Sequence, residues 1–176
     1  MCCEDKCKIF KLILIFSIIF ILFIAILFLC INNNQNKDKN ILVATAQNGD
    51  NTETGDVIIK FSQNKIIVGD ALSHTTGSSE IMINKDGIYQ ISYQLTGVAQ
   101  ETGIFNFNAI LAVNNLPLIE TLNEGSVIQS SISNNRYTLT STVILKLNAG
   151  DILQLDGLSL EEVEYINARI DIEEIY

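Results

Sequence analysis

The chain has 176 residues with 20 acidic and 11 basic side chains, which gives a formal net charge of −9. Residues 32–176 hold 18 of the acidic and 8 of the basic residues, a net charge of −10. This acidity argues against binding of nucleic acid and against docking onto anionic lipid. These roughly 145 residues are enough for one domain with a real core.

The first predicted element is a transmembrane helix over residues 12–31. The segment reads LILIFSIIFILFIAILFLCI and has no formal charge, with Ser17 as its only hydroxyl. As a helix it would be roughly 30 Å long, the thickness of the hydrocarbon core of a bilayer. A helix can cross lipid because it satisfies its own backbone hydrogen bonds.

The flanking charges predict the orientation of this segment. Three lysines lie in residues 1–11, and two lie in the polar linker of residues 32–40. The excess before the segment predicts that residues 1–11 are a cytoplasmic tail and that the C-terminal domain is extracellular. The alternative is a cleaved signal peptide, which has a shorter apolar region and a small-x-small exit. Because residues 27–30 read Leu-Phe-Leu-Cys, we expect an uncut signal-anchor.

The cysteines all precede the predicted domain of residues 41–176. They are Cys2, Cys3, Cys7 and Cys30, so the domain contains no disulfide and its fold must rest on packing. The first three could carry lipid on their thiols. They could equally be reduced cysteines in a short tail.

Alternation of apolar and polar residues dominates residues 41–176 and predicts an all-β fold. Residues 88–95, 105–113 and 137–147 alternate as half-buried strands do. Shorter candidate strands lie at residues 41–46, 57–61, 65–68, 80–83, 118–122, 126–132, 151–155 and 166–175. Gly and Asn turn signals separate them, among them residues 123–125, Asn-Glu-Gly. This many short strands predicts a two-sheet sandwich of the jelly-roll type.

Aromatic residues on the apolar faces are the expected core or trimer-axis positions. They are Tyr89, Tyr93, Phe105, Phe107 and Tyr137. We expect Gly87 and Gly150 to hold turns.

Two short runs, residues 110–113 and 143–145, are apolar on both faces. A strand of an isolated sandwich should have one solvent-exposed face. Burial against a second copy would explain these runs, and so would cover by a loop.

Several stretches resemble one superfamily. Residues 86–95, DGIYQISYQL, and 147–155, LNAGDILQL, resemble conserved strands of the tumour necrosis factor (TNF) and complement-head jelly rolls. Residues 112–118, AVNNLPL, and 168–176, ARIDIEEIY, resemble its bacterial branch, the C-terminal domain of the exosporium protein BclA. The resemblance covers residues 41–176. It implies a ten-stranded TNF-like jelly roll that assembles as a homotrimer without catalysis.

The sequence departs from the bacterial branch in two places. Asn115 stands where that branch often has Gly, which is tolerable because Asn accepts a positive φ. A membrane anchor replaces the collagen-like stalk of spore-surface members, which favours a cell-membrane setting.

The residues offer little chemistry. The one histidine, His74, follows Ser73, but sequence neighbours on a strand or loop usually point apart, so we expect a solvated loop histidine and no nucleophile–base pair. One histidine also excludes a multi-histidine zinc site.

We expect no cofactor. Calcium is the least implausible metal, because five acidic residues could converge: Asp50, Asp56, Asp151, Asp156 and Glu161.

Three classes of function remain open. The first, which we favour, is a membrane-anchored trimeric head with a structural, adhesive or binding role towards a protein or carbohydrate partner. The second is a cytokine-type ligand for a receptor. The third is an enzyme on a β-sandwich, for which one histidine and no external cysteine leave mostly carboxylates.

Overall fold

The structure is a computed structural model that describes residues 16–26, 39–47, 55–99, 103–129, 136–159 and 163–176. The side chains of residues 99, 103–105 and 126–129 are outside this description. The chain divides into two compact units, Met1–Asp38 and Lys39–Tyr176.

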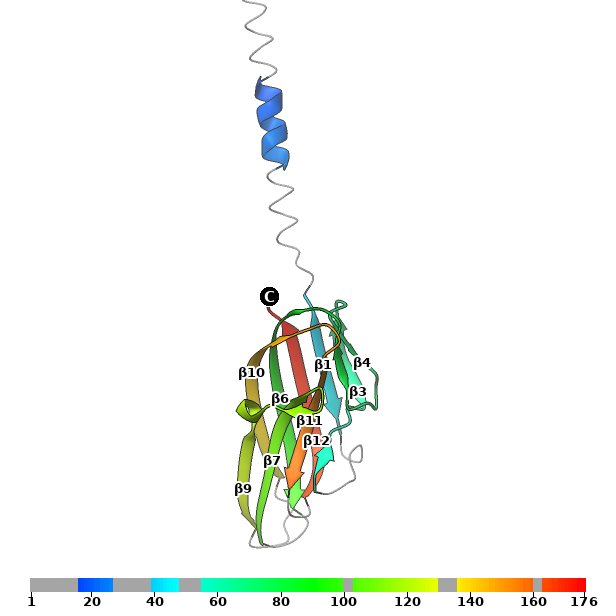
Figure 1. Cartoon of the computed structure of the whole chain (residues 1–176), viewed down its shortest axis with the longest axis vertical. Coiled ribbons are helices and arrows are strands. Elements are labelled where there is room, and N and C mark those ends of the chain that lie inside the picture. Colours follow the sequence, from blue (N-terminus) through cyan, green and yellow to red (C-terminus); the bar gives the residue numbers. More distant parts are fainter. Residues whose placement is uncertain (1–15, 27–38, 48–54, 100–102, 130–135, 160–162) are drawn as a thin grey trace, which may run out of the picture. The chain divides into compact units, whose positions relative to one another are not determined.

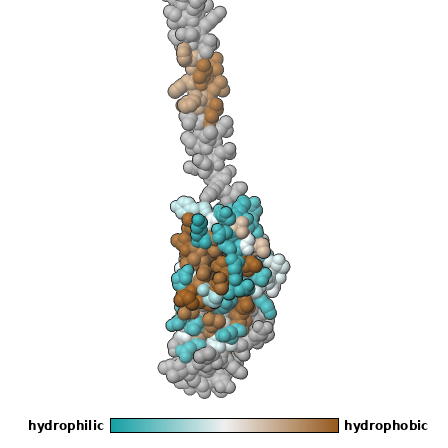
Figure 2. All heavy atoms as spheres, in the orientation of Figure 1, coloured by the Kyte–Doolittle hydropathy of each residue, from teal (hydrophilic) through white to brown (hydrophobic). Residues whose placement is uncertain are grey.

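The described part of the first unit is a helix over residues 16–26. Its large apolar side chains are exposed, and Figure 2 shows them as a hydrophobic surface. Residues 12–15 and 27–31 of the predicted transmembrane segment lie outside the described residues, as do residues 1–11 and 32–38. Among the described residues, no helix combines the length and the apolar character needed to cross a bilayer.

The second unit is an all-β sandwich of two antiparallel sheets, which confirms the predicted fold class (Figure 1). The five-stranded sheet has, in spatial order, β10 (Arg136–Leu147), β6 (Gly87–Ala99), β12 (Val163–Glu174), β1 (Ile41–Ala46) and β3 (Gln63–Val68). The seven-stranded sheet has β4 (Leu72–His74), β5 (Ile81–Ile83), β11 (Ile152–Ser159), β7 (Gly103–Val113) and β8 (Leu116–Pro117) in order, with β2 (Val57–Ile58) paired to β11 and β9 (Asn123–Gln129) paired to β7. Most neighbours are not consecutive in sequence, as a jelly roll requires.

The core lies between the two sheets and is built from alternate residues of each strand. On β6, Tyr89, Ile91, Tyr93 and Leu95 are all buried, while Gln90 and Gln94 between them are exposed. The facing strand β7 contributes Phe107, Ala109 and Leu111. This period of two follows from the pleat, which sends successive side chains to opposite faces.

Three local predictions are wrong. Residues 118–122 were expected as a strand, but Ile119–Thr121 is a 3₁₀ turn, η1, because the Thr121 hydroxyl accepts from Leu111 N and donates to Leu118 O. Residues 123–125, expected as a turn, belong to β9.

The third concerns His74, which lies in the unpredicted strand β4 and is only 9% exposed. Its Nδ1 lies 2.5 Å from Asn64 Oδ1 and its Nε2 lies 3.0 Å from Ser78 O, and its ring meets Phe61 edge-on. His74 on β4 therefore contacts Asn64 on the edge strand β3, and we call this contact the clasp between β3 and β4. His74 is not the solvated loop histidine that the sequence predicted.

The chain enters and leaves the sandwich at the same end (Figure 1). Ile41 pairs with Glu173, and Asn40, expected in the linker, is 4% exposed. Asn40 Oδ1 accepts from Asp70 N and Ala71 N, and its Nδ2 donates to Glu174 Oε2. This residue therefore ties the start of the domain to its last strand.

Candidate interaction surfaces

Four of the predicted core or trimer-axis residues have described side chains. Tyr89, Tyr93 and Phe107 lie inside the sandwich, and Tyr137 packs half-buried at its margin. The side chain of Phe105 lies outside the described residues. The structure thus places the three buried aromatics in the core of a single copy, away from any outer face.

The buried tyrosines keep partners for their hydroxyls. Tyr93 donates to Ala109 O and Thr121 O, and burial raises its pKa. Tyr89 donates to Lys85 O, and burial, followed by the charges of Glu174 and Asp86, raises its pKa to about 12. Neither tyrosine offers a free hydroxyl for chemistry.

The two predicted turn glycines differ in their roles. Gly150 lies between β10 and β11 with φ +95°, a left-handed conformation that favours glycine. Gly87 opens β6, where a Cβ atom would lie 3.1 Å from both Tyr176 O and the Tyr89 ring. Close approach of the C-terminus therefore explains Gly87.

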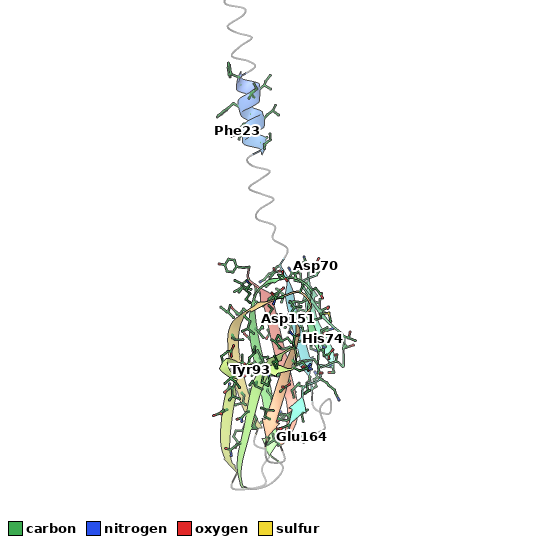
Figure 3. All side chains as sticks on the ribbon, in the orientation of Figure 1. Phe23, Asp70, His74, Tyr93, Asp151 and Glu164 are labelled. Carbon is green, nitrogen blue, oxygen red and sulfur yellow. The ribbon has the colours of Figure 1, made fainter. Side chains whose placement is uncertain are left out.

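Two of the acidic residues proposed for calcium, Asp151 and Asp56, accept hydrogen bonds from backbone amides. Asp151 Oδ2 accepts from Asn148 N at 2.8 Å, which lowers the pKa of Asp151, and Asp56 Oδ1 accepts from Ser159 N at 3.1 Å. Figure 3 shows Asp151 towards the end of the sandwich that carries the C-terminus. Asp50 and Glu161 lie outside the described residues, and the rest of the described chain brings no three His, Cys, Asp or Glu residues together for a metal.

The outer face of the five-stranded sheet, which points away from the core, is hollowed. Three neighbouring cavities of about 280, 290 and 160 Å³ lie along it. The first two share Gln94 and Arg169, and the last two share Ser92 and Asp171. Arg169 donates to the Asp171 carboxylate through Nε and Nη2, both at 2.8 Å. The hollows therefore form one polar groove across β1, β6, β12 and β10.

Two apolar surfaces lie at opposite edges of the same sheet. The β3 strip consists of Ile66, Ile67 and Val68, each 44–47% exposed. At the opposite edge of the sheet, Ile144 of β10 is 59% exposed, and Ile119 of η1 is 71% exposed. Exposed apolar side chains gathered in this way are typical of surfaces that bind protein.

The structure explains one of the two runs, residues 110–113 and 143–145, that are apolar on both faces. Ile110 and Ala112 are buried within a single copy although they face away from the core, so this run needs no second copy. Ile144, from the other run, remains exposed. Neither the β3 strip nor the polar groove was expected from the sequence, because outward polar residues are the default on a strand.

Solved structures share this fold. The globular domain of zebrafish complement 1qA superposes with a TM-score of 0.58 at 10% identity, covering 79% of this chain and 98% of that domain. Murine APRIL at pH 8.0 superposes with a TM-score of 0.57 at 12% identity, covering 78% of this chain and 99% of that one. No protein-family profile and no curated protein sequence matches the chain. The domain therefore shares the jelly-roll fold of these two solved structures.

Proposed function

We propose that the chain is a non-catalytic, membrane-anchored head that assembles as a homotrimer and binds a partner outside the cell. The observation that carries this proposal is the fold, shared over nearly the whole length of the complement 1qA domain and of APRIL. The BclA branch, suggested by residues 112–118 and 168–176, would add a structural or adhesive role.

The membrane anchor in this proposal rests on the sequence. Residues 12–31 carry no formal charge over a length that matches the hydrocarbon core. The excess of lysines in residues 1–11 supports a cytoplasmic N-terminus and an extracellular domain.

The apolar edges support self-association. The β3 strip and Ile144 of β10 lie at opposite edges of one sheet, so they can meet only between different copies. Contact of two different surfaces is a heterologous interface, which propagates from copy to copy and closes into a ring when the rotation allows. A ring of three closes if each contact rotates the chain by a third of a turn.

An experiment on intact cells tests this proposal. The protein should resist extraction by alkaline carbonate, and a membrane-impermeant cross-linker should yield products up to three copies and no larger. Ile66→Glu should reduce the three-copy product at least tenfold, because it places a charge in the apolar contact. Met82→Glu, at a similarly exposed position on the other sheet, is the matched control and should leave the product unchanged. Release by carbonate, or an equal effect of both substitutions, would contradict the proposal.

The second candidate is a cytokine-type ligand, which the similarity to APRIL supports at the level of fold. This function requires a specific receptor on another cell, whereas a structural head does not. Binding of the displayed protein to one saturable cell-surface protein would favour the ligand function.

A further inference from the structure

His74, the only histidine of the chain, is buried in the clasp between β3 and β4 (Figure 3). Its Nδ1 lies 2.5 Å from Asn64 Oδ1, and its Nε2 lies 3.0 Å from Ser78 O. Asn64 closes the clasp with a second bond, because its Nδ2 donates to His74 O at 2.9 Å. Both ring nitrogens therefore face oxygen atoms that accept hydrogen bonds.

The orientation of the Asn64 amide follows from these contacts. The backbone oxygen of His74 can only accept, so it needs the Nδ2 group of Asn64 opposite it, and Oδ1 then points at the ring. Turning the amide over would give ring Nδ1 a donor, but it would place Oδ1 against His74 O, which sets two acceptors face to face. The amide therefore cannot serve a ring nitrogen that lacks a proton without leaving another contact unsatisfied.

The charge of the ring decides whether every contact is satisfied. A neutral imidazole carries one N–H, so the lone pair of its other nitrogen faces the oxygen of Asn64 or of Ser78. The imidazolium carries two N–H groups and donates to both oxygens. These two bonds offset the cost of burying a charge, since a bond from a charged donor is roughly twice as strong as a neutral one. The clasp is therefore complete only when His74 is positively charged.

Few charged groups lie around the ring. Glu80, just before β5, lines the same hollow of about 210 Å³ as His74, and its carboxylate favours a positive ring. Lys60 and Lys65, in the neighbouring segment that leads into β3, oppose it. The rest of β3, β4, β5 and residues 75–79 carries no charged side chain. Because Glu80 and both lysines are exposed, water screens their charges, and the direct hydrogen bonds of the ring decide its protonation.

The attachment of β3 depends on this clasp more than that of an inner strand would. β3 is the last strand of its sheet and pairs there with β1 alone among the described strands. Residues 65–68 are exposed on both faces of the strand. The same strand carries the β3 strip, which is a contact surface in the trimer proposed above. The state of the clasp therefore determines how firmly this contact surface is held.

We propose that His74 is a proton-sensitive clasp: a protonated ring fixes β3 to β4 and strengthens contact through the β3 strip, and loss of the proton loosens both. Since the closed clasp binds the proton more tightly than the open one, it is firm at acidic pH and weakens as the pH rises. Histidine ordinarily titrates near pH 6.5, so pH 5.5 and pH 8 bracket the change. The effect on contact between copies rests on the proposed trimer, whereas the effect on β3 needs one copy only.

Hydrogen exchange of the full-length protein in detergent at pH 5.5 and pH 8 tests the clasp, with each rate divided by that of an unstructured chain at the same pH. Protection of β3 and β4 should fall about tenfold from pH 5.5 to pH 8, the loss expected for a hydrogen bond to a charged group. Protection of β6, inside the sheet, should stay within about twofold.

Two asparagine variants isolate the contact with the ring. Asn64→Ala removes the acceptor at Nδ1, so protection of β3 should be lower and should no longer depend on pH. Asn84→Ala is the matched control, because it also loses a bond from its Nδ2 to a backbone oxygen, that of Asp70, and should keep the tenfold change. Labelling with ¹⁵N-histidine reports on His74 alone, and both of its ring nitrogens should carry protons at pH 5.5.

Three results would overturn the clasp: equal protection of β3 at the two pH values, a ring nitrogen without a proton at pH 5.5, or a pH response that survives Asn64→Ala. Exchange of copies between differently labelled trimers tests the contact and should be about tenfold faster at pH 8. An unchanged exchange rate beside a responsive β3 would overturn the link to assembly. A responsive β3 in a protein of one copy overturns the trimer alone, and a trimer with an unresponsive β3 overturns the clasp alone.

Discussion

Asp156 points outward from β11, and one of its carboxylate oxygens, Oδ1, is buried without a hydrogen-bond partner among the described residues. It pairs across the sheet with Ile58 and Ile110, so its surroundings are apolar. Burial raises the pKa of this carboxyl. A carboxylate kept in such a place costs stability when it is ionised.

We expect Asp156→Asn to stabilise the domain at pH 7 by about 1 kcal/mol. The raised pKa means that the folded chain binds this proton more tightly than the unfolded chain does. The unfolding free energy of the original protein therefore falls as the pH rises from the ordinary aspartate value of 3.8 through the raised value. Denaturant unfolding from pH 3 to pH 7 measures this difference. The unfolding free energy of Asp156→Asn should exceed that of the original protein at pH 7, and the excess should shrink towards pH 3.

Asp151→Asn is the matched control, with the opposite sign. Hydrogen bonds from Asn148 N and Asn114 lower the pKa of Asp151, so its carboxylate stabilises the fold above the ordinary value. This contribution is lost as the pH falls through the lowered value, and Asp151→Asn should therefore destabilise the domain at pH 7. A shift of both variants in one direction at pH 7 would contradict the assignment.

Asn40 supports a second prediction. Asn40→Ala would leave the amides of Asp70 and Ala71 without their acceptor, so we expect a loss of roughly 2 kcal/mol in unfolding free energy. Gly69→Ala should destabilise the same contact, because a Cβ atom at this φ of +79° would lie 1.9 Å from Asn40 Oδ1. Gly77→Ala, also at positive φ but with open space around it, isolates the backbone cost. Equal losses for the two glycine variants would exclude the Asn40 contact.

At the scale of the element, the long strands could be predicted and the short ones could not. Over residues 88–95 of β6 and along β10, inward residues alternate with more exposed ones, so the period is visible in the sequence, and β7 was recognised from its long apolar stretch. β4 has three residues, too few to show a period. η1 depends on the hydrogen bond from Leu111 N in β7 to the Thr121 hydroxyl, a contact ten residues apart in sequence that local preferences do not contain.

The clasp between β3 and β4 yields a third prediction. His74→Ala removes a buried ring and its contacts with Asn64 and Ser78, so we expect a loss of roughly 2 kcal/mol. Hydrogen exchange should accelerate in β3 and β4 more than in β6, which lies inside the sheet. Ser73→Ala, at the exposed neighbouring position, should leave exchange unchanged. Uniform acceleration over all strands would show that the clasp has no local role.

At the scale of the whole molecule, the two-sheet sandwich could be predicted because stretches of alternating apolar and polar residues follow one another along the sequence. The polar groove could not be predicted, since it depends on which strands become neighbours in the sheet. Its residues alternate with core residues as any solvated strand face does. Likewise, the β3 strip reads as an ordinary strand until the topology places it at an edge.

Assembly of three copies is the central claim at this scale, and the mass of the full-length protein in detergent tests it most directly. Light scattering coupled to size exclusion, corrected for bound detergent, should give three protein copies per particle across a hundredfold range of concentration. Ile66→Glu should shift the mass towards a single copy, and Met82→Glu should not. A single copy at every concentration of the original protein would contradict the account.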